Sequence, residues 1–229
     1  MKHQLFLLLC ILALISCQKQ FEISDSTQGG TGSGGGTGTT PGTTSGAYQA
    51  YTKGSYWKYK DSATGGFTTM TATDKTKTIN GRNYTAFLQA NATQSDTAYY
   101  ANENHDYYNY FDVKSNTSGA TMLLHYLNDT ATVGRSWQYA AGQGNGFAAY
   151  IRTTTLEKNI SLTVNGKTYN NVIHTNLDLM YDVLGTLDKW ASYEYYVAKD
   201  VGLIRLRTTI STLGLSVVST LDLVEYQIK

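Results

Sequence analysis

Tyrosine is the residue type in this sequence with the clearest capacity to bind a ligand. Five tyrosines crowd a short segment that reads as two neighbouring strands, and they are Tyr99, Tyr100, Tyr107, Tyr108 and Tyr110. Because side chains alternate along a strand, Tyr108 and Tyr110 face away from Tyr107. An exposed set can stack on sugars or contact a protein, so Tyr100, Tyr108 and Tyr110 are candidate ligand-binding residues. The alternative is cross-strand aromatic pairing that only stabilises the sheet.

The histidines do not have the spacing of a metal centre. Beyond the N-terminal segment there are three of them, His105, His125 and His174. No two are four residues apart and no cysteine lies near them, so the ligand spacings of zinc sites are absent. His105 stands in a polar string that reads as a hairpin turn, and His125 stands in MLLHYL, within an expected strand. We predict no bound metal.

Catalytic motifs are also missing from the sequence. A carboxylate pair for glycoside hydrolysis would have to come from Glu103, Asp106, Glu157, Asp178, Asp182, Glu194 or Asp222. The sequence alone does not bring any two of them to the separation of about 5–10 Å that this chemistry needs. There is no Gly-x-Ser-x-Gly nucleophile elbow, and GQGNG at 142–146 reads as a hairpin loop. We expect a protein that is not an enzyme and carries no cofactor.

The N-terminus has the features of a bacterial lipoprotein signal. A basic start at Lys2 precedes an apolar run over 5–15, which is too short to span a bilayer and fits a signal-peptide core. The run ends in LISC at 14–17, which resembles a lipobox. We predict that residues 1–16 are a signal peptide and that Cys17 is acylated, which would tie the protein to a membrane. The alternative is an ordinary secreted protein in which this cysteine is incidental.

Residues 17–46 are predicted to be the lipidated cysteine followed by a flexible tether. The segment contains GGTGSGGGTGTTPGTTSG, which has almost no apolar surface to bury. A Gly-rich coil of this length has a root-mean-square span of roughly 30 Å. We therefore expect the folded part of the chain to stand away from the membrane.

The remainder of the chain, 47–229, has the pattern of an all-β domain. Short runs of Tyr, Thr, Val, Ile and Leu alternate with polar residues, and no segment keeps the 3.6-residue period of a helix. Residues 160–164 alternate with period two and precede Asn165-Gly166, a strong hairpin signal. The return strand has apolar side chains on one face and His174 on the other, as in an antiparallel sheet with one wet face.

Two motifs recur within this domain. They are GSYWKY and GRSWQY at 54–59 and 134–139, and Asn-Gly-basic-x-Tyr at 80–84 and 165–169. The recurrence suggests two diverged halves, 47–130 and 131–229. Together they predict antiparallel sheets of about 10–12 strands, given the average length of strands and turns. The fold would be a β-sandwich, a barrel or a half-barrel.

The tryptophans of the recurring motif, Trp57 and Trp137, are predicted to be core anchors. Large aromatic side chains release much apolar surface from water when they are buried. The alternative is that both are exposed platforms for a ligand. Their recurrence at equivalent places favours the core.

Charge argues against two classes of partner. Loss of Lys2 with the signal peptide leaves equal numbers of basic and acidic residues. A nucleic-acid binder needs a cationic surface to neutralise phosphates, and docking on anionic lipid needs one too. We predict no nucleic-acid partner, and membrane contact through the acyl chains alone.

The run YYVAKDVGLI at 195–204 resembles a segment of uncharacterised lipoproteins of Bacteroidota-type bacteria that share Gly-x-x-Trp-x-Tyr. With the lipobox and the tether, the resemblance implies a lipoprotein of the cell envelope, anchored in the outer membrane. It implies no activity. We expect a non-catalytic binding or assembly role, with a glycan or an envelope protein as partner. The alternatives are a periplasmic carrier for an apolar ligand and, less favoured, an envelope hydrolase.

Overall fold

The computed structural model describes residues 46–229 apart from 116–117, 145–146 and 213–214. The predicted signal peptide and Cys17 lie outside the described residues. The domain is all-β, as predicted, and its described part contains no helix. None of these residues therefore forms a helix able to cross a membrane. The strands are β1 (Tyr56–Asp61), β2 (Phe67–Ile79), β3 (Arg82–Ala90), β4 (Ser95–Glu103), β5 (Asp106–Ser115), β6 (Ser118–Asn128), β7 (Ser136–Gly144), β8 (Phe147–Val164), β9 (Lys167–Val183), β10 (Thr186–Ala198), β11 (Gly202–Thr212) and β12 (Leu215–Gln227).

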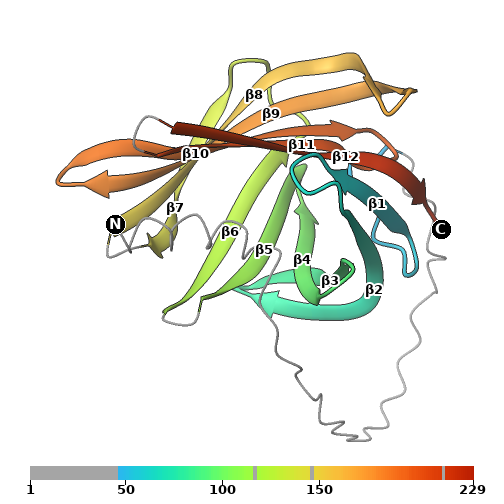
Figure 1. The fold of residues 1–229 in the computed structure, drawn as a ribbon, viewed down its shortest axis with the longest axis horizontal. Helices are drawn as coiled ribbons and strands as arrows, with labels where there is room; N and C mark the ends of the chain where they lie inside the picture. Colours follow the sequence, from blue (N-terminus) through green and yellow to red (C-terminus); the bar gives the residue numbers. More distant parts are fainter. Residues whose placement is uncertain (1–45, 116–117, 145–146, 213–214) are drawn as a thin grey trace, which may run out of the picture.

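The twelve strands form one antiparallel sheet in which most neighbours in sequence are neighbours in space (Figure 1). The order is β6-β5-β4-β3-β2-β1-β12-β11-β10-β9-β8-β7. The first and last strands pair in the middle of the sheet, where Tyr56 lies opposite Gln227. The sheet curls until its two edge strands, β6 and β7, approach each other. The structure is therefore a nearly closed barrel, and the predicted antiparallel architecture is confirmed.

Two-residue Asn-Gly turns join two pairs of neighbouring strands. Asn165 and Gly166 have φ angles of 48° and 78°, and they connect β8 to β9. Asn80 and Gly81 connect β2 to β3 with φ angles of 50° and 78°. Positive φ at both central residues is the type I′ geometry, whose twist matches that of the flanking strands. The hairpin predicted at Asn165-Gly166 is confirmed.

The recurring motifs fall on strands of the same rank. Trp57 lies on β1 and Trp137 on β7, which open two runs of six strands. Each Asn-Gly turn joins the second and third strands of its run. The boundary predicted at 130/131 falls in the connection between β6 and β7. Divergence of the two halves from one ancestor stays a prediction.

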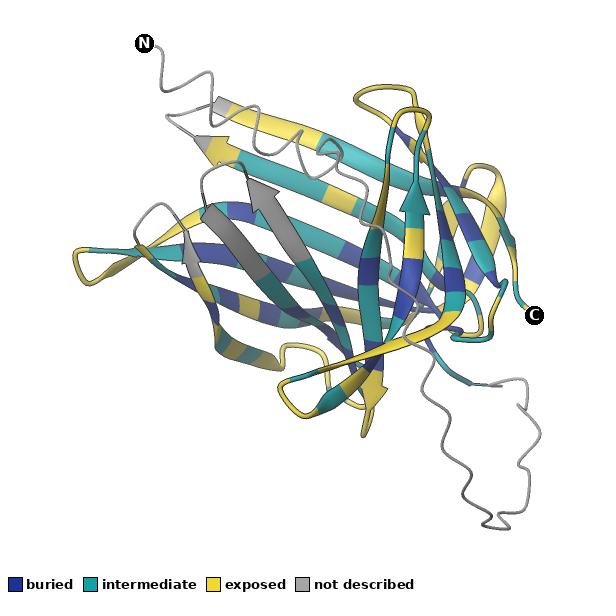
Figure 2. Ribbon diagram, turned by 90° about the horizontal axis from the view of Figure 1, so that it is seen from below, coloured by how far each residue is buried: buried dark blue, intermediate teal, exposed yellow. Residues whose placement is uncertain are grey.

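Two packed clusters fill the inside of the curled sheet. The first joins β5 and β6 to β8–β10, and its least exposed members are Tyr107, Leu127, Ile151, Ile173, Leu177 and Val197. The second joins β1–β3 to β8–β12, and its least exposed members are Trp57, Ala72, Phe87, Val164, Val172, Ala198, Ile204 and Leu223. Figure 2 shows buried residues along the middle of the strands and exposed residues at the hairpin tips. The apolar side chains of these two clusters therefore fill the interior of the barrel.

The two tryptophans have different surroundings. Trp57 is 0% exposed, and its indole N–H donates a 2.6 Å hydrogen bond to the carbonyl oxygen of Val201. The prediction of a core anchor is confirmed for Trp57. Trp137 is only half-buried, because it lies on an edge strand. Equivalent positions in the two runs thus do not have equivalent burial.

The first described residues pack into one end of the barrel. Tyr48 is buried, and its backbone N–H donates a 3.1 Å hydrogen bond to the hydroxyl of Tyr107. The N–H of Asp200, in the turn after β10, donates to the carbonyl oxygen of Ala47 at 2.7 Å. The C-terminus lies close by, since the N–H of Lys229 donates to the hydroxyl of Ser55 at 3.0 Å. The described part of the chain therefore begins at the end of the barrel where its C-terminus lies.

Strands β6 and β7 have no backbone ladder between them in the described parts of the chain. Side chains connect them instead. The hydroxyl of Tyr139 accepts a 2.6 Å hydrogen bond from the N–H of His125. The carbonyl oxygen of His125 accepts hydrogen bonds from the indole of Trp137 at 3.2 Å and the hydroxyl of Thr153 at 2.8 Å. These bonds satisfy backbone groups of an edge strand that would otherwise be unpaired.

Candidate functional site

Alternation along β4 and β5 divides the candidate tyrosines between the two faces of the sheet. In the ladder between these strands Tyr99 lies opposite Tyr110, and Ala101 lies opposite Tyr108. Opposite residues share a face, so Tyr99, Tyr108 and Tyr110 project together, away from the core clusters. Each is partly exposed. We use the name outer aromatic face for the group formed by Lys77, Arg82, Tyr84, Tyr99, Tyr108 and Tyr110.

Tyr100 lies on the other face of the sheet. Its ring centroid is 4.9 Å from that of Phe87 and 6.4 Å from that of Tyr126, and it packs against both core clusters. Burial raises the pKa of the Tyr100 hydroxyl well above its usual value. The structure therefore brings Tyr108 and Tyr110 together but places Tyr100 with the core, where it does not join their surface.

Lys77, on β2, lies over two of the outer tyrosines. Its ammonium nitrogen is 5.0 Å from the ring centroid of Tyr99 and 5.5 Å from that of Tyr110. Both distances are within the range of a cation–π interaction. Tyr84 is buried beside them, with its ring centroid 6.2 Å from that of Tyr110. One end of the outer aromatic face is thus a pair of partly exposed rings that share a single cation.

Arg82, at the start of β3, covers the third outer tyrosine. Its guanidinium carbon lies 3.6 Å from the ring centroid of Tyr108, and its Nε donates a 2.8 Å hydrogen bond to Glu103. Burial opposes the charged form of Arg82, but hydrogen bonds to Tyr84 and Glu103 raise its pKa. Burial, followed by the nearby Asp106 carboxylate, raises the pKa of Tyr108. Arg82 is therefore held in place, and its positive charge is balanced by the carboxylate of Glu103.

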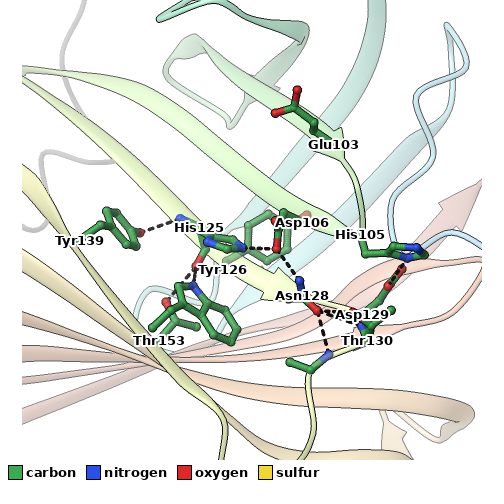
Figure 3. Close-up of polar contacts among 12 residues, drawn as sticks. Glu103, His105, Asp106, His125, Tyr126, Asn128, Asp129, Thr130, Tyr139 and Thr153 are labelled. Carbon is green, nitrogen blue, oxygen red and sulfur yellow. Dashed lines mark hydrogen bonds and ion pairs between the residues drawn. The ribbon is translucent and has the colours of Figure 1, made fainter.

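His125 continues the same face toward the edge of the sheet. Its ring is stacked on Tyr108 at a centroid distance of 4.6 Å and lies 4.8 Å from Trp137. Its Nε2 is 2.8 Å from the carboxylate of Asp106, which also accepts a 2.6 Å hydrogen bond from Asn128 (Figure 3). Burial lowers the pKa of His125, although Asp106 opposes the change. This histidine is a partly buried link between β5, β6 and β7.

His105 occupies the turn between β4 and β5, as predicted. It has a φ of 73°, and Asn104 before it has a φ of 50°, so the turn has the two positive φ angles of type I′. Its Nδ1 is 2.7 Å from the carboxylate of Asp129 (Figure 3), which also accepts a 3.1 Å hydrogen bond from the Tyr107 hydroxyl. These contacts hold the turn against the β6–β7 connection. Among the described residues no group of His, Cys, Asp and Glu has the geometry to hold a metal ion.

His174 lies on the outward face of β9, where the alternation predicted it, yet its neighbours bury it. Its ring is stacked on Tyr196 at a centroid distance of 4.0 Å. Its Nδ1 is 2.8 Å from the Glu157 carboxylate, and its Nε2 is 3.6 Å from that of Glu194. The cluster joins β8, β9 and β10 through polar contacts. It forms a second polar group on the outside of the barrel.

Several of the acidic residues considered for catalysis lie in ion pairs. Glu103 pairs with Arg82 at 2.8 Å and Glu194 pairs with Arg207 at 2.9 Å. Asp222 accepts hydrogen bonds of 2.6 Å and 2.9 Å from Arg205. A carboxylate that is held by a guanidinium is poorly placed to act as a general acid. These contacts have the character of cross-strand pairs.

Sequence reasoning missed the two cations of the outer aromatic face. Lys77 and Arg82 lie on either side of the Asn80-Gly81 turn, so a hairpin at this turn brings them near each other. Their approach to Tyr99 and Tyr108 depends on the pairing of β3 with β4 and of β4 with β5. No spacing in the sequence reports that pairing.

Two solved structures align with most of this chain. No protein-family model matches the chain, and no curated protein matches it. A protein from Bacteroides fragilis, assigned as exported and with a YmcC-like fold, aligns with a TM-score of 0.46 and 10% identity over 78% of this chain and 97% of its own. A protein from Parabacteroides distasonis, assigned as a lipoprotein, aligns with a TM-score of 0.46 and 10% identity over 80% of this chain and 99% of its own. Similarity at this level transfers no site and no activity.

Proposed function

We propose that this protein is a lipid-anchored lipoprotein of the cell envelope that binds a glycan, without catalysis, through its outer aromatic face. The observation that carries the proposal is the grouping of Tyr99, Tyr108 and Tyr110 on one outward face, with cations placed on their rings. Aromatic rings supply apolar contact to the C–H faces of sugars, and a tyrosine hydroxyl is a group that can both donate and accept a hydrogen bond.

The polar groups beside the tyrosines suit the same ligand class. Arg82 and Glu103 provide donors and acceptors next to Tyr108. Each sugar hydroxyl both donates and accepts hydrogen bonds, and a guanidinium beside a carboxylate can supply the partner for each. A protein partner would instead favour a larger apolar centre with a polar rim.

Anchoring through Cys17 in the outer membrane is the second part of the proposal. It rests on the signal-like N-terminus and on the lipobox resemblance. Cells grown with a clickable palmitate analogue should yield labelled wild-type protein and unlabelled Cys17→Ala protein. Equal labelling of both would refute acylation at this cysteine. Protease treatment of intact and broken cells would then report on which side of the outer membrane the domain lies.

The carrier hypothesis has weaker support. It needs an open apolar cavity within the curled sheet. The inward side chains of the described strands instead pack into two clusters, with residues such as Ile151, Leu177 and Ile204 at 0% exposure. We therefore give the outward face priority over the interior.

A glycan array tests the binding proposal directly. Detergent-solubilised full-length protein should bind a subset of glycans, and a Tyr99→Ala/Tyr110→Ala variant should lose about tenfold in affinity. That loss corresponds to roughly 1.4 kcal/mol, within reach of one or two aromatic contacts. Tyr226→Ala is the matched control, because Tyr226 is also a partly exposed tyrosine beneath a lysine. Wild-type protein that binds no glycan, or equal binding by the double variant, would refute the proposal.

A further inference from the structure

We infer that the glycan bound at the outer aromatic face is anionic, and that the ammonium group of Lys77 contacts its carboxylate or sulfate groups. The inference rests on the proposed glycan-binding function and adds the charge of the ligand. It is carried by the position of one lysine over two rings, compared with the other cations of the same surface.

Lys77 has no ion-pair partner among the described residues, whereas Arg82, the other cation of the outer aromatic face, has one. The side chain of Lys77 is exposed and lies above Tyr99 and Tyr110. The ion pairs found among the described residues do not include it, whereas Arg82 is paired with Glu103 and Lys53 with Asp74. Its positive charge is therefore available to an incoming anion.

The position of Lys77 also disfavours a neutral ligand. A neutral sugar that stacked on Tyr99 or Tyr110 from the lysine side would have to displace the ammonium group from both rings. An acidic sugar can keep that contact and add an ion pair to it. Because the rings hold the cation in place, less side-chain freedom is lost when the anion binds. The site is therefore better suited to a uronate or a sulfated sugar than to a neutral one.

A second lysine in the same barrel gives a matched comparison. Lys167 also lies over two tyrosine rings, at 5.3 Å from the centroid of Tyr169 and 4.2 Å from that of Tyr226. Its ammonium group, however, donates a 3.0 Å hydrogen bond to the hydroxyl of Tyr226. No hydrogen bond of this kind is found for Lys77 within the described chain. The two sites share the motif and differ in how far the cation is already engaged.

The test uses one polymer in two charge states. Binding of the full-length protein to polygalacturonate and to the same polymer after complete methyl esterification is measured by calorimetry at low salt. We expect the charged form to bind about tenfold more tightly, the equivalent of one additional ionic contact. Added salt should remove most of the difference, because exposed charges are screened. Lys77→Gln should remove it as well, while Lys77→Arg and Lys167→Gln should retain it.

Each outcome has a defined meaning. Equal affinity for both polymers, unchanged by Lys77→Gln, would overturn the inference and leave the proposed glycan binding intact. Binding of neither polymer would overturn the inference, and the glycan array would decide separately whether the proposed function also fails. If Lys77→Gln and Lys167→Gln lost the preference for the charged polymer equally, the cause would be the net charge of the protein, and the inferred role of Lys77 would be overturned. Thermal unfolding of each variant confirms that the fold is retained.

Discussion

The backbone N–H of His125 donates a 2.6 Å hydrogen bond to the hydroxyl of Tyr139, across the junction between the two edge strands of the barrel. An edge strand normally leaves a row of unpaired backbone groups, which invite association with other chains. Here a side chain of one edge meets a backbone group of the other. The junction therefore depends on particular side chains rather than on a ladder, and substitutions should affect it selectively.

Tyr139→Phe should weaken this junction. The change removes one hydroxyl and leaves the N–H of His125 without its partner, which costs about 1–3 kcal/mol when the group is buried. The free energy of unfolding, measured by urea denaturation, should fall by that amount. Tyr150→Phe, on the outward side of neighbouring β8, is the control and should change stability by less than about 0.5 kcal/mol. Equal losses of stability in the two variants would show that the hydrogen bond between Tyr139 and His125 does not stabilise the junction.

The two tryptophans should differ in their contribution to stability. Trp57→Ala removes a fully buried ring and should lower the free energy of unfolding by about 3–5 kcal/mol. Trp137→Ala should cost clearly less, because part of that ring is exposed to water in the folded state. Both values can be measured from denaturation curves. Equal losses would support the earlier expectation that the two tryptophans are equivalent core anchors.

Leu184→Asn should stabilise the protein. Leu184 is 97% exposed and has a φ of 54° in the turn between β9 and β10, where Gly185 follows it. A branched side chain in the left-handed region costs about 1–2 kcal/mol, whereas asparagine adopts it readily. We expect a gain of about 1 kcal/mol in the free energy of unfolding.

The reciprocal change provides the control for this turn. Asn80 has a φ of 50° in the corresponding position of its own turn. Asn80→Leu should therefore destabilise the protein by a similar amount. A destabilised Leu184→Asn protein would show that the leucine makes a favourable contact in solution.

The stability of the protein should depend on pH through His125. Burial lowers the pKa of His125 below the ordinary histidine value of 6.5, so between the lowered pKa and 6.5 the unfolded chain binds more protons than the folded chain. The free energy of unfolding should therefore rise with pH across this window. The contribution is complete above the unfolded pKa and is lost as the pH falls through the folded pKa.

Two separate histidine-to-asparagine substitutions test this pH dependence. Denaturation curves between about pH 5 and 8 should show a shallower slope for His125→Asn than for wild type. His105→Asn is the control, since His105 is exposed and asparagine tolerates its positive φ. Identical slopes for wild type and His125→Asn would mean that His125 does not carry the effect.

Local patterns were enough to predict the class of fold. Side-chain alternation depends only on the two-residue period of a strand, so the antiparallel all-β domain could be read along the chain. Asn-Gly pairs report positive φ at two successive residues, and this predicted the hairpin at Asn165-Gly166. The recurrence of the tryptophan motif predicted the burial of Trp57 correctly, but it made the same prediction for Trp137, which is half-buried.

To predict which tyrosines lie on which face of the sheet, one must also know the length of the β4–β5 turn. Asn104 and His105 form a two-residue turn without glycine, so the sequence carried only a weak signal of its length. That length sets the register in which Tyr99 lies opposite Tyr110 and Tyr100 lies opposite Asn109. Once the register is known, alternation alone separates Tyr100 from Tyr108 and Tyr110.

The all-β class, the hairpin at Asn165-Gly166 and the alternation that gives each strand two faces could be predicted from the sequence, because they follow from interactions between residues close in the chain. Three features are seen only in the folded chain: the curl of the sheet into a barrel, the contact of Tyr139 with His125, and the position of Lys77 over Tyr99 and Tyr110. These contacts depend on strand order, register and curl, which are set by the packing of the whole core. The candidate binding face is therefore a product of long-range pairing.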